Sequence, residues 1–204
     1  MYLLSLNLLN MIENLLNLVK QYAGDAIINN PDIPNERNEE AVQETAASIE
    51  NGLQGVLAQG GVKDLLSMFT GRTGVTNDNP VVQNISGGLM ETMMQKFGLD
   101  RGKAGGIVGS LLPVILGQLV NRTKDPNDNG FNIQDIFNGL SGGKTAGTDI
   151  SGLAGRMMQG GLDKDGDGDV DLQDLMGMFS GGGNNASTKQ GNNPLDALKG
   201  MFGQ

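Results

Sequence analysis

The segment Ala104-Gly-Gly-Ile-Val-Gly-Ser-Leu-Leu-Pro-Val-Ile-Leu-Gly-Gln-Leu-Val120 carries no charged side chain over 17 residues. A membrane-spanning helix needs about 20 predominantly apolar residues, so this stretch lies at the low edge of that range. We therefore expect the central buried helix of a bundle, kinked at Pro113, where the proline ring removes a backbone hydrogen bond. The segment is flanked by four cations, Arg101, Lys103, Arg122 and Lys124. Together with the small-xxx-small pair Gly105 and Gly109, they leave a membrane span as the alternative, although membrane insertion is not expected.

Apolar residues at helical spacing predict further helices before this segment. We expect a long helix over residues 38–58, a short one over 62–69 and another over 81–97. The last should end at Gly98, as a glycine C-cap does. No stretch predicts a strand of any length. The expected fold is therefore all-α: an irregular multi-helix bundle of eight or nine helices around residues 104–120, with one EF-hand-like helix–loop–helix near the C-terminus.

The N-terminal region predicts an amphipathic helix and no secretory signal. From Met11 onward one helical face carries apolar side chains, namely Ile12, Leu15, Leu16 and Val19. No basic residue precedes Lys20, and no Ala-x-Ala cleavage site follows. Met11 is also a candidate for the native start. The compartment stays open: the sequence favours the cytoplasm because it lacks a clear signal peptide, with a periplasmic or envelope-associated location as the alternative.

Two prolines among four asparagine and aspartate residues mark residues 29–35 as a linker. With the polar stretch at 181–193, this linker predicts a division into four parts. They are an N-terminal helix and linker at 1–36, a helical core at 37–147, an EF-hand-like unit at 148–180, and a flexible tail with a short terminal helix at 181–204.

The composition argues against several classes of function. The net charge is −9, whereas nucleic acids and anionic membrane surfaces require clustered Lys and Arg. The chain has no Cys and no His, which excludes thiol and imidazole nucleophile–base pairs and the usual zinc sites. No cofactor fingerprint is visible either, so we do not expect an enzyme.

One stretch predicts a metal-binding site: Asp163-Lys-Asp-Gly-Asp-Gly-Asp-Val-Asp-Leu-Gln-Asp174. Aspartates occupy EF-hand loop positions 1, 3, 5, 7, 9 and 12, and Gly168 occupies position 6, where the loop turns sharply. Calcium takes about six to eight oxygen ligands at roughly 2.3–2.6 Å from these positions. The predicted calcium ligands are Asp163, Asp165, Asp167, Asp169, Asp171 and Asp174. A plain acidic turn would not place aspartates at every odd position around a correctly placed glycine.

The helices on either side of this loop are expected at residues 149–162 and 172–179. Position 12 departs from the usual motif, because Asp174 stands where most EF-hands have glutamate. The shorter carboxylate must approach the ion more closely to bind through both oxygens. The affinity for calcium and the selectivity for calcium over magnesium therefore do not follow from the motif. In this respect the loop resembles the calcium repeats of dockerins.

A short phrase recurs four times along the chain. Val62-Lys-Asp-Leu-Leu-Ser-Met-Phe-Thr-Gly71, Ile133-Gln-Asp-Ile-Phe-Asn-Gly-Leu-Ser-Gly142 and Leu172-Gln-Asp-Leu-Met-Gly-Met-Phe-Ser-Gly181 share one pattern, which Pro194-Leu-Asp-Ala-Leu-Lys-Gly-Met-Phe-Gly203 echoes. Each predicts a short amphipathic helix closed by glycine, too short to be stable without packing. The spacing of the copies is irregular, which argues against a stacked solenoid.

The second copy follows a degenerate version of the calcium loop. In residues 125–135, Asp125, Asn127 and Asn129 fit positions 1, 3 and 5, and Asp135 fits position 12, with one residue missing after the glycine. EF-hands usually work in pairs, so this loop is the natural candidate partner. The alternative is a polar turn without metal.

The runs Ile85-Ser-Gly-Gly-Leu89, Lys96-Phe-Gly-Leu-Asp100 and Leu111-Leu-Pro-Val-Ile-Leu-Gly-Gln-Leu119 resemble the YidB-like bacterial helical family. The resemblance covers about residues 80–122. It implies a glycine-rich helical fold and offers no activity, because the function of that family is not established.

Two classes of function follow. In the first, the chain is a calcium-binding protein whose ion organises the C-terminal part for contact with a protein partner. In the second, it is a helical subunit, adaptor or plug of a larger bacterial assembly, such as a cell-envelope or secretion complex, in which calcium is structural or incidental.

Overall fold

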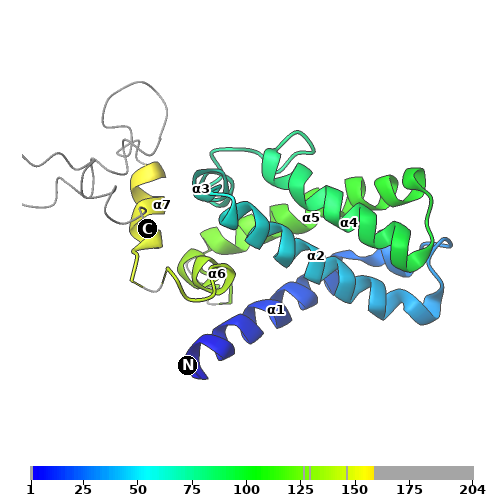
Figure 1. The fold of residues 1–204 in the computed structure, drawn as a ribbon, viewed down its shortest axis with the longest axis horizontal. Helices are drawn as coiled ribbons and strands as arrows, with labels where there is room; N and C mark the ends of the chain where they lie inside the picture. The colour runs from blue at the N-terminus through cyan, green and yellow to red at the C-terminus, as the bar shows by residue number, and fades with distance from the viewer. Residues whose placement is uncertain (1, 126, 129, 146, 159–204) are drawn as a thin grey trace, which may run out of the picture.

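The computed structural model describes residues 2–125, 127–128, 130–145 and 147–158 (Figure 1). These residues form helices and no β-strand, which confirms the all-α class. In chain order the elements are α1 (Tyr2–Tyr22), the π-helical turn η1 (Gly24–Ile28), the 3₁₀ turn η2 (Asn35–Arg37), α2 (Asn38–Ala58), α3 (Val62–Phe69), α4 (Pro80–Phe97), α5 (Arg101–Lys124), α6 (Ile133–Leu140) and α7 (Ile150–Met158).

The centre of the bundle is the layered packing of α2, α4 and α5. Helix α2 packs most extensively against α4, and α4 packs against α5 (Figure 1). The first pair approaches closely at Gly52, where a Cβ would lie only 2.6 Å from Ile85 Cγ1. Helix α1 then covers α2 and α5, and α6 packs on α1 and α2. Helix α7 is added at the outer side of α6.

Local capping sets the turn between α4 and α5. Gly98 has φ 68° and its N–H donates to the Met94 carbonyl oxygen, so α4 ends as predicted. Only three residues later α5 begins, because the Asp100 side chain accepts a hydrogen bond from the Lys103 N–H at 2.9 Å. Leu99, between these caps, is buried. The two helices therefore return side by side as a hairpin.

The uncharged segment is the centre of the core, as predicted, although its helix runs from Arg101 to Lys124 and is longer than residues 104–120. Its buried side chains are Ala104, Ile107, Val108, Leu111, Leu112, Ile115, Leu116, Leu119 and Val120. Pro113 lies inside the helix, and the predicted kink stays a prediction. Among the helices that the structure describes, α5 is the one long and apolar enough to cross a membrane, with 50% of its most apolar window buried inside the protein.

The buried face of α1 differs slightly from the predicted one. Leu15 and Val19 are buried as expected, together with Leu18, whereas Ile12 and Leu16 are only half-buried. The apolar stripe is therefore rotated toward Leu18, which faces the neighbouring helices. The segment predicted as a linker follows, and within it Ile33 is buried in the same core cluster.

Replacing Ile115 by alanine should lower the free energy of unfolding by about 2–5 kcal/mol, because the fully buried side chain would leave a cavity. The matched control is Val114→Ala on the same helix, where the side chain is 45% exposed and the change should stay within about 0.5 kcal/mol. Denaturant unfolding of both variants measures the difference. Equal losses would show that α5 does not pack as described.

Candidate metal centre

The six predicted calcium ligands lie outside the described residues, as do the exiting helix at 172–179 and the tail at 181–204. The structure describes part of the predicted entering helix. The predicted entering helix, 149–162, corresponds to α7 over its described part, Ile150–Met158. Residue 163, the first position of the predicted loop, follows Met158, the last described residue of α7, in the chain.

Helix α7 begins at a side-chain cap and is attached to α6. The Asp149 Oδ1 accepts a hydrogen bond from the Gly152 N–H at 2.7 Å, which satisfies one free donor of the first turn. The side chain of Gln134 on α6 forms two hydrogen bonds to the backbone at the start of α7. Its Oε1 accepts from the Ile150 N–H at 2.9 Å and its Nε2 donates to the Thr148 carbonyl oxygen at 3.0 Å. Ile150 and Ala154 are buried. The stretch that precedes the acidic loop is thus fixed to the bundle.

In the degenerate loop at 125–135, the described carboxylates close local turns. Asp125 Oδ1 accepts hydrogen bonds from the Asn127 backbone N–H at 2.9 Å and from Asn127 Nδ2 at 3.2 Å. Asp128 Oδ1 accepts from the Gly130 N–H at 2.9 Å. Within the described part of the chain, no three acidic, His or Cys side chains gather in a way that could hold a metal ion. Metal binding at this loop therefore stays a prediction without further support.

The end of this loop is closed by a pair of side chains. Asn132 Oδ1 accepts a hydrogen bond from the Asp135 N–H at 3.0 Å and so caps α6. In the opposite direction, Asn132 Nδ2 donates to Asp135 Oδ2 at 2.6 Å. The cap thus uses both the acceptor and the donor of one amide. Nearby, Asn14 Nδ2 of α1 donates to the Gly130 carbonyl oxygen at 3.1 Å and ties the loop to the bundle.

The two described copies of the repeated phrase, α3 and α6, are short helices with the same ending. In α3 the Gly71 N–H donates to the Met68 carbonyl and the Arg72 N–H to the Ser67 carbonyl, at 3.0 and 2.8 Å. In α6 the Gly142 N–H donates to the Gly139 carbonyl oxygen at 3.1 Å, and the Gly143 N–H donates to the Asn138 carbonyl oxygen at 2.8 Å. Both closing glycines have positive φ, 76° at Gly71 and 62° at Gly142. The predicted glycine-closed helices are confirmed for these two copies.

The same two helices meet through their aromatic side chains. The rings of Phe69 and Phe137 lie edge to face, with centroids 6.2 Å apart and planes at 68°. Both side chains are fully buried. Such a short helix is not stable alone, so this contact and the neighbouring apolar packing hold each copy in place.

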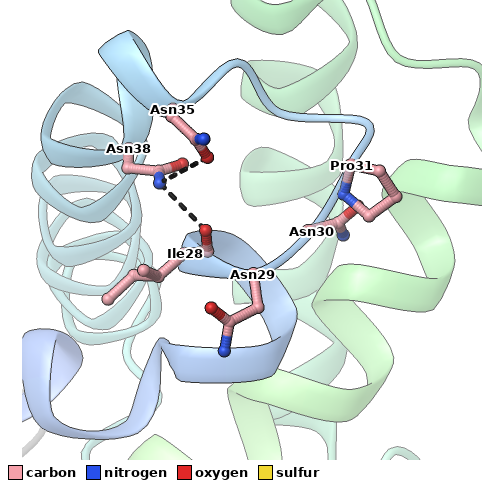
Figure 2. Close-up of a pocket in the computed structure, with 6 residues that line it drawn as sticks. All are labelled: Ile28, Asn29, Asn30, Pro31, Asn35 and Asn38. Carbon is pink, nitrogen blue, oxygen red and sulfur yellow. Dashed lines mark hydrogen bonds between the residues drawn. The ribbon is translucent and has the colours of Figure 1, made fainter.

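A separate cavity of about 530 Å³ lies at the turn between η1 and α2, lined by Ile28, Asn29, Asn30, Pro31, Asn35 and Asn38 (Figure 2). The amides mostly hold the turn itself. Asn38 Nδ2 donates to the Ile28 carbonyl at 3.0 Å, as Figure 2 shows, and Asn30 Nδ2 donates to the Ala26 carbonyl at 3.0 Å. The Asn38 Oδ1 is buried and has no hydrogen-bond partner among the described residues. None of the six lining side chains is ionisable, so they supply no acid–base chemistry.

The chain matches no known family model, no curated protein and no solved structure. The resemblances to the YidB-like family and to dockerin repeats therefore stay predictions.

Replacing Gly142 by alanine should destabilise the protein by about 1–2 kcal/mol, because an L-residue is strained at φ 62°. A Cβ there would meet no atom within 4 Å, so the loss comes from the backbone alone. Gly155→Ala in α7 is the matched control: its Cβ would also meet nothing, and alanine favours the helix. Thermal unfolding of both variants compares them, and a Gly142 variant as stable as the wild type would contradict the described helix end.

Proposed function

We propose that this chain is a non-enzymatic calcium-binding helical protein that acts as a protein-interaction module. The observation that carries the proposal is the placement of six aspartates around Gly168 in residues 163–174. Asp163, Asp165 and Asp167 would supply side-chain oxygens and Asp169 its backbone carbonyl. Asp171 would bind directly or through water, and Asp174 would close the site.

The described copy of the loop end supports this chemistry. There, Asn132 and Asp135 face each other as amide and carboxylate, with Nδ2 to Oδ2 at 2.6 Å. In the third copy the same two positions, one before the helix and its third residue, are Asp171 and Asp174. Two carboxylates at such a separation repel each other unless a cation lies between them. A calcium ion would supply that positive charge.

The attachment of α7 also supports the proposal. An EF-hand loop follows an entering helix, and the start of α7, the helix that precedes residue 163 in the chain, is capped by Asp149 and fixed to α6 through Gln134. The exiting helix would carry Met176 and Met178. Methionine side chains are flexible and polarisable, and they adapt to several partner surfaces. Calcium would thus present an adaptable apolar surface to another protein.

A second function is favoured by the outer face of α5. This helix passes the length and hydropathy test for a membrane span, and a Cβ at Gly106, Gly109 or Gly117 would meet no atom within 4 Å. Glycine lowers helix stability by about 1 kcal/mol relative to alanine, and nothing in the described chain requires it at these positions. This face would suit a helical subunit, adaptor or plug of a larger envelope or secretion assembly, because small residues allow close contact with another helix. Calcium would then be structural or incidental.

Calorimetric titration tests calcium binding. The wild type should release or absorb heat with a Kd near 10⁻⁴–10⁻³ M, roughly the range of extracellular modules, because Asp174 is short. Asp163→Ala should lose this signal, whereas the control Asp125→Ala in the degenerate loop should keep it. A wild-type trace as flat as that of Asp163→Ala at millimolar calcium would reduce residues 163–174 to an acidic turn.

The interaction role predicts calcium-dependent capture. Full-length wild-type protein should retain a partner from the native host only when calcium is present, and Asp163→Ala should not retain it in either condition. Mass spectrometry identifies the retained proteins. Partners that bind equally well to both variants, with and without calcium, would instead favour the structural subunit.

Fractionation addresses the membrane alternative. Because much of the apolar surface of α5 is already buried against other helices, carbonate washing should release the full-length protein from membranes. Recovery only after detergent extraction would contradict this expectation and place α5 in the bilayer.

A further inference from the structure

We propose that the cavity between η1 and α2 is a binding site for a neutral ligand that carries a primary carboxamide. Its volume of about 530 Å³ lies within the range of roughly 300–1,000 Å³ that small-molecule sites occupy. The lining residues are all described, and none of them is a predicted calcium ligand. The site therefore adds a binding activity that does not depend on the proposed function.

The chain around the cavity is fixed to the rest of the bundle. One wall is the end of η1, a π-helical turn, which is a rare geometry that occurs frequently at functional sites. Ile27 in this turn and Ile33 after it are buried in the core. Lys103 Nζ lies 2.6 Å from Asp32 Oδ1 and joins the loop to α5. The wall is thus preorganised, which lowers the entropy cost of binding a ligand.

The lining side chains favour a neutral ligand. Four of the six are asparagines and none can ionise, so an ion that left water would gain no opposite charge from them. The other two, Ile28 and Pro31, supply apolar surface, and Ile28 is 42% exposed. A ligand with an uncharged polar group next to an apolar one matches this combination.

Two of the asparagines hold the turn itself. Asn29 Nδ2 donates to Asp25 Oδ1 at 3.2 Å. Asn30 Nδ2 donates to the Ala26 carbonyl oxygen at 3.0 Å, and Asn30 Oδ1 accepts from the Asp32 N–H at 3.0 Å. The donors of both amides are therefore engaged within the protein.

The other two asparagines leave one acceptor and one donor. Asn38 Nδ2 donates to the Ile28 carbonyl oxygen at 3.0 Å and, over a longer 3.5 Å, to Asn35 Oδ1 (Figure 2). Asn38 Oδ1 is buried without a partner among the described residues, which is unfavourable for an acceptor. The Asn35 side chain bonds to described residues through Oδ1, so its two Nδ2 hydrogens stay available.

This pair of groups complements the edge of a carboxamide. The amides of Asn35 and Asn38 contact each other, so the free donor and the free acceptor are neighbours. A primary carboxamide presents an N–H and a C=O side by side, and it can donate to Asn38 Oδ1 while it accepts from Asn35 Nδ2. Asn35 is exposed and makes only the long contact, so its side chain can turn to admit the ligand. A carboxylate in the same place has no hydrogen to donate to Asn38 Oδ1.

Nuclear magnetic resonance of the full-length protein tests this site with matched probes. Acetyl-glutamine N-methylamide and nicotinamide carry a carboxamide, and acetyl-glutamate N-methylamide and nicotinate carry a carboxylate in its place. At tens of millimolar, the two carboxamides should shift the signals of residues 28–38, including the side-chain amides of Asn35 and Asn38, and the carboxylates should not. Asn35→Ala should weaken binding about tenfold, the effect of one hydrogen bond. The control Asn77→Ala, at an exposed loop position between α3 and α4, should bind as the wild type does.

Each outcome decides the proposal. Shifts from one carboxamide alone support the site and identify the source of the ligand, a peptide side chain for the glutamine probe or a free small molecule for nicotinamide. Equal shifts from carboxamides and carboxylates, no shift from either carboxamide, or unchanged affinity in Asn35→Ala would overturn it. Asp163→Ala should bind the carboxamides as the wild type does, so loss of the calcium proposal leaves this one standing.

Discussion

The structure depends on burial of the apolar face of α5. The helix has no charged side chain from Ala104 to Val120, so it would expose a large apolar surface if water surrounded it. The hydrophobic effect therefore favours packing of the neighbouring helices against it. Helix α4 folds back on it through the Gly98 turn, and α2 then packs along α4. The close approach at Gly52 and Ile85 fixes how tightly these layers meet.

The charged contacts position segments relative to one another and add little to the free energy of unfolding. Lys103 Nζ donates to Asp32 Oδ1 at 2.6 Å and joins the start of α5 to the segment after η1. The Arg37 guanidinium lies 4.4 Å from the centre of the Phe97 ring and forms hydrogen bonds to Glu40, which lowers the pKa of that carboxyl group. The charged side chains of these pairs are about a third to a half exposed, and ion pairs near the surface typically contribute less than about 1 kcal/mol. They position segments that the apolar core has already brought together.

The short helices α3 and α6 are two copies of one structural unit. Copies α3 and α6 have the same hydrogen-bonded ending and contact each other through Phe69 and Phe137. Neither has enough length to persist alone, so each is stable only where the bundle offers apolar contacts. In the sequence, the acidic stretch at 163–174 follows α7, whose start is held by Gln134, and it overlaps the beginning of another copy of the same phrase at residue 172.

Local signals in the sequence were sufficient for most of the fold. Helices α2 and α3 begin and end at the predicted residues, because the apolar spacing and the closing glycines act over a few residues. The fold class and the burial of residues 104–120 followed from the same patterns. The proposed calcium ligands at 163–174 also rest on the sequence alone, because EF-hand ligands come from one continuous stretch of chain.

Only the tertiary structure decided which side of each helix faces inward and which distant segments meet. The buried face of α1 includes Leu18 and leaves Ile12 and Leu16 half-buried, since the positions of its neighbouring helices select the face. The two hydrogen bonds of Gln134, to the Thr148 carbonyl oxygen and from the Ile150 N–H, join α6 to the start of α7 across a separation that no spacing rule specifies. Sequence determines periodicity and loop chemistry through neighbouring residues, whereas contacts between distant segments are decided by how the whole core packs.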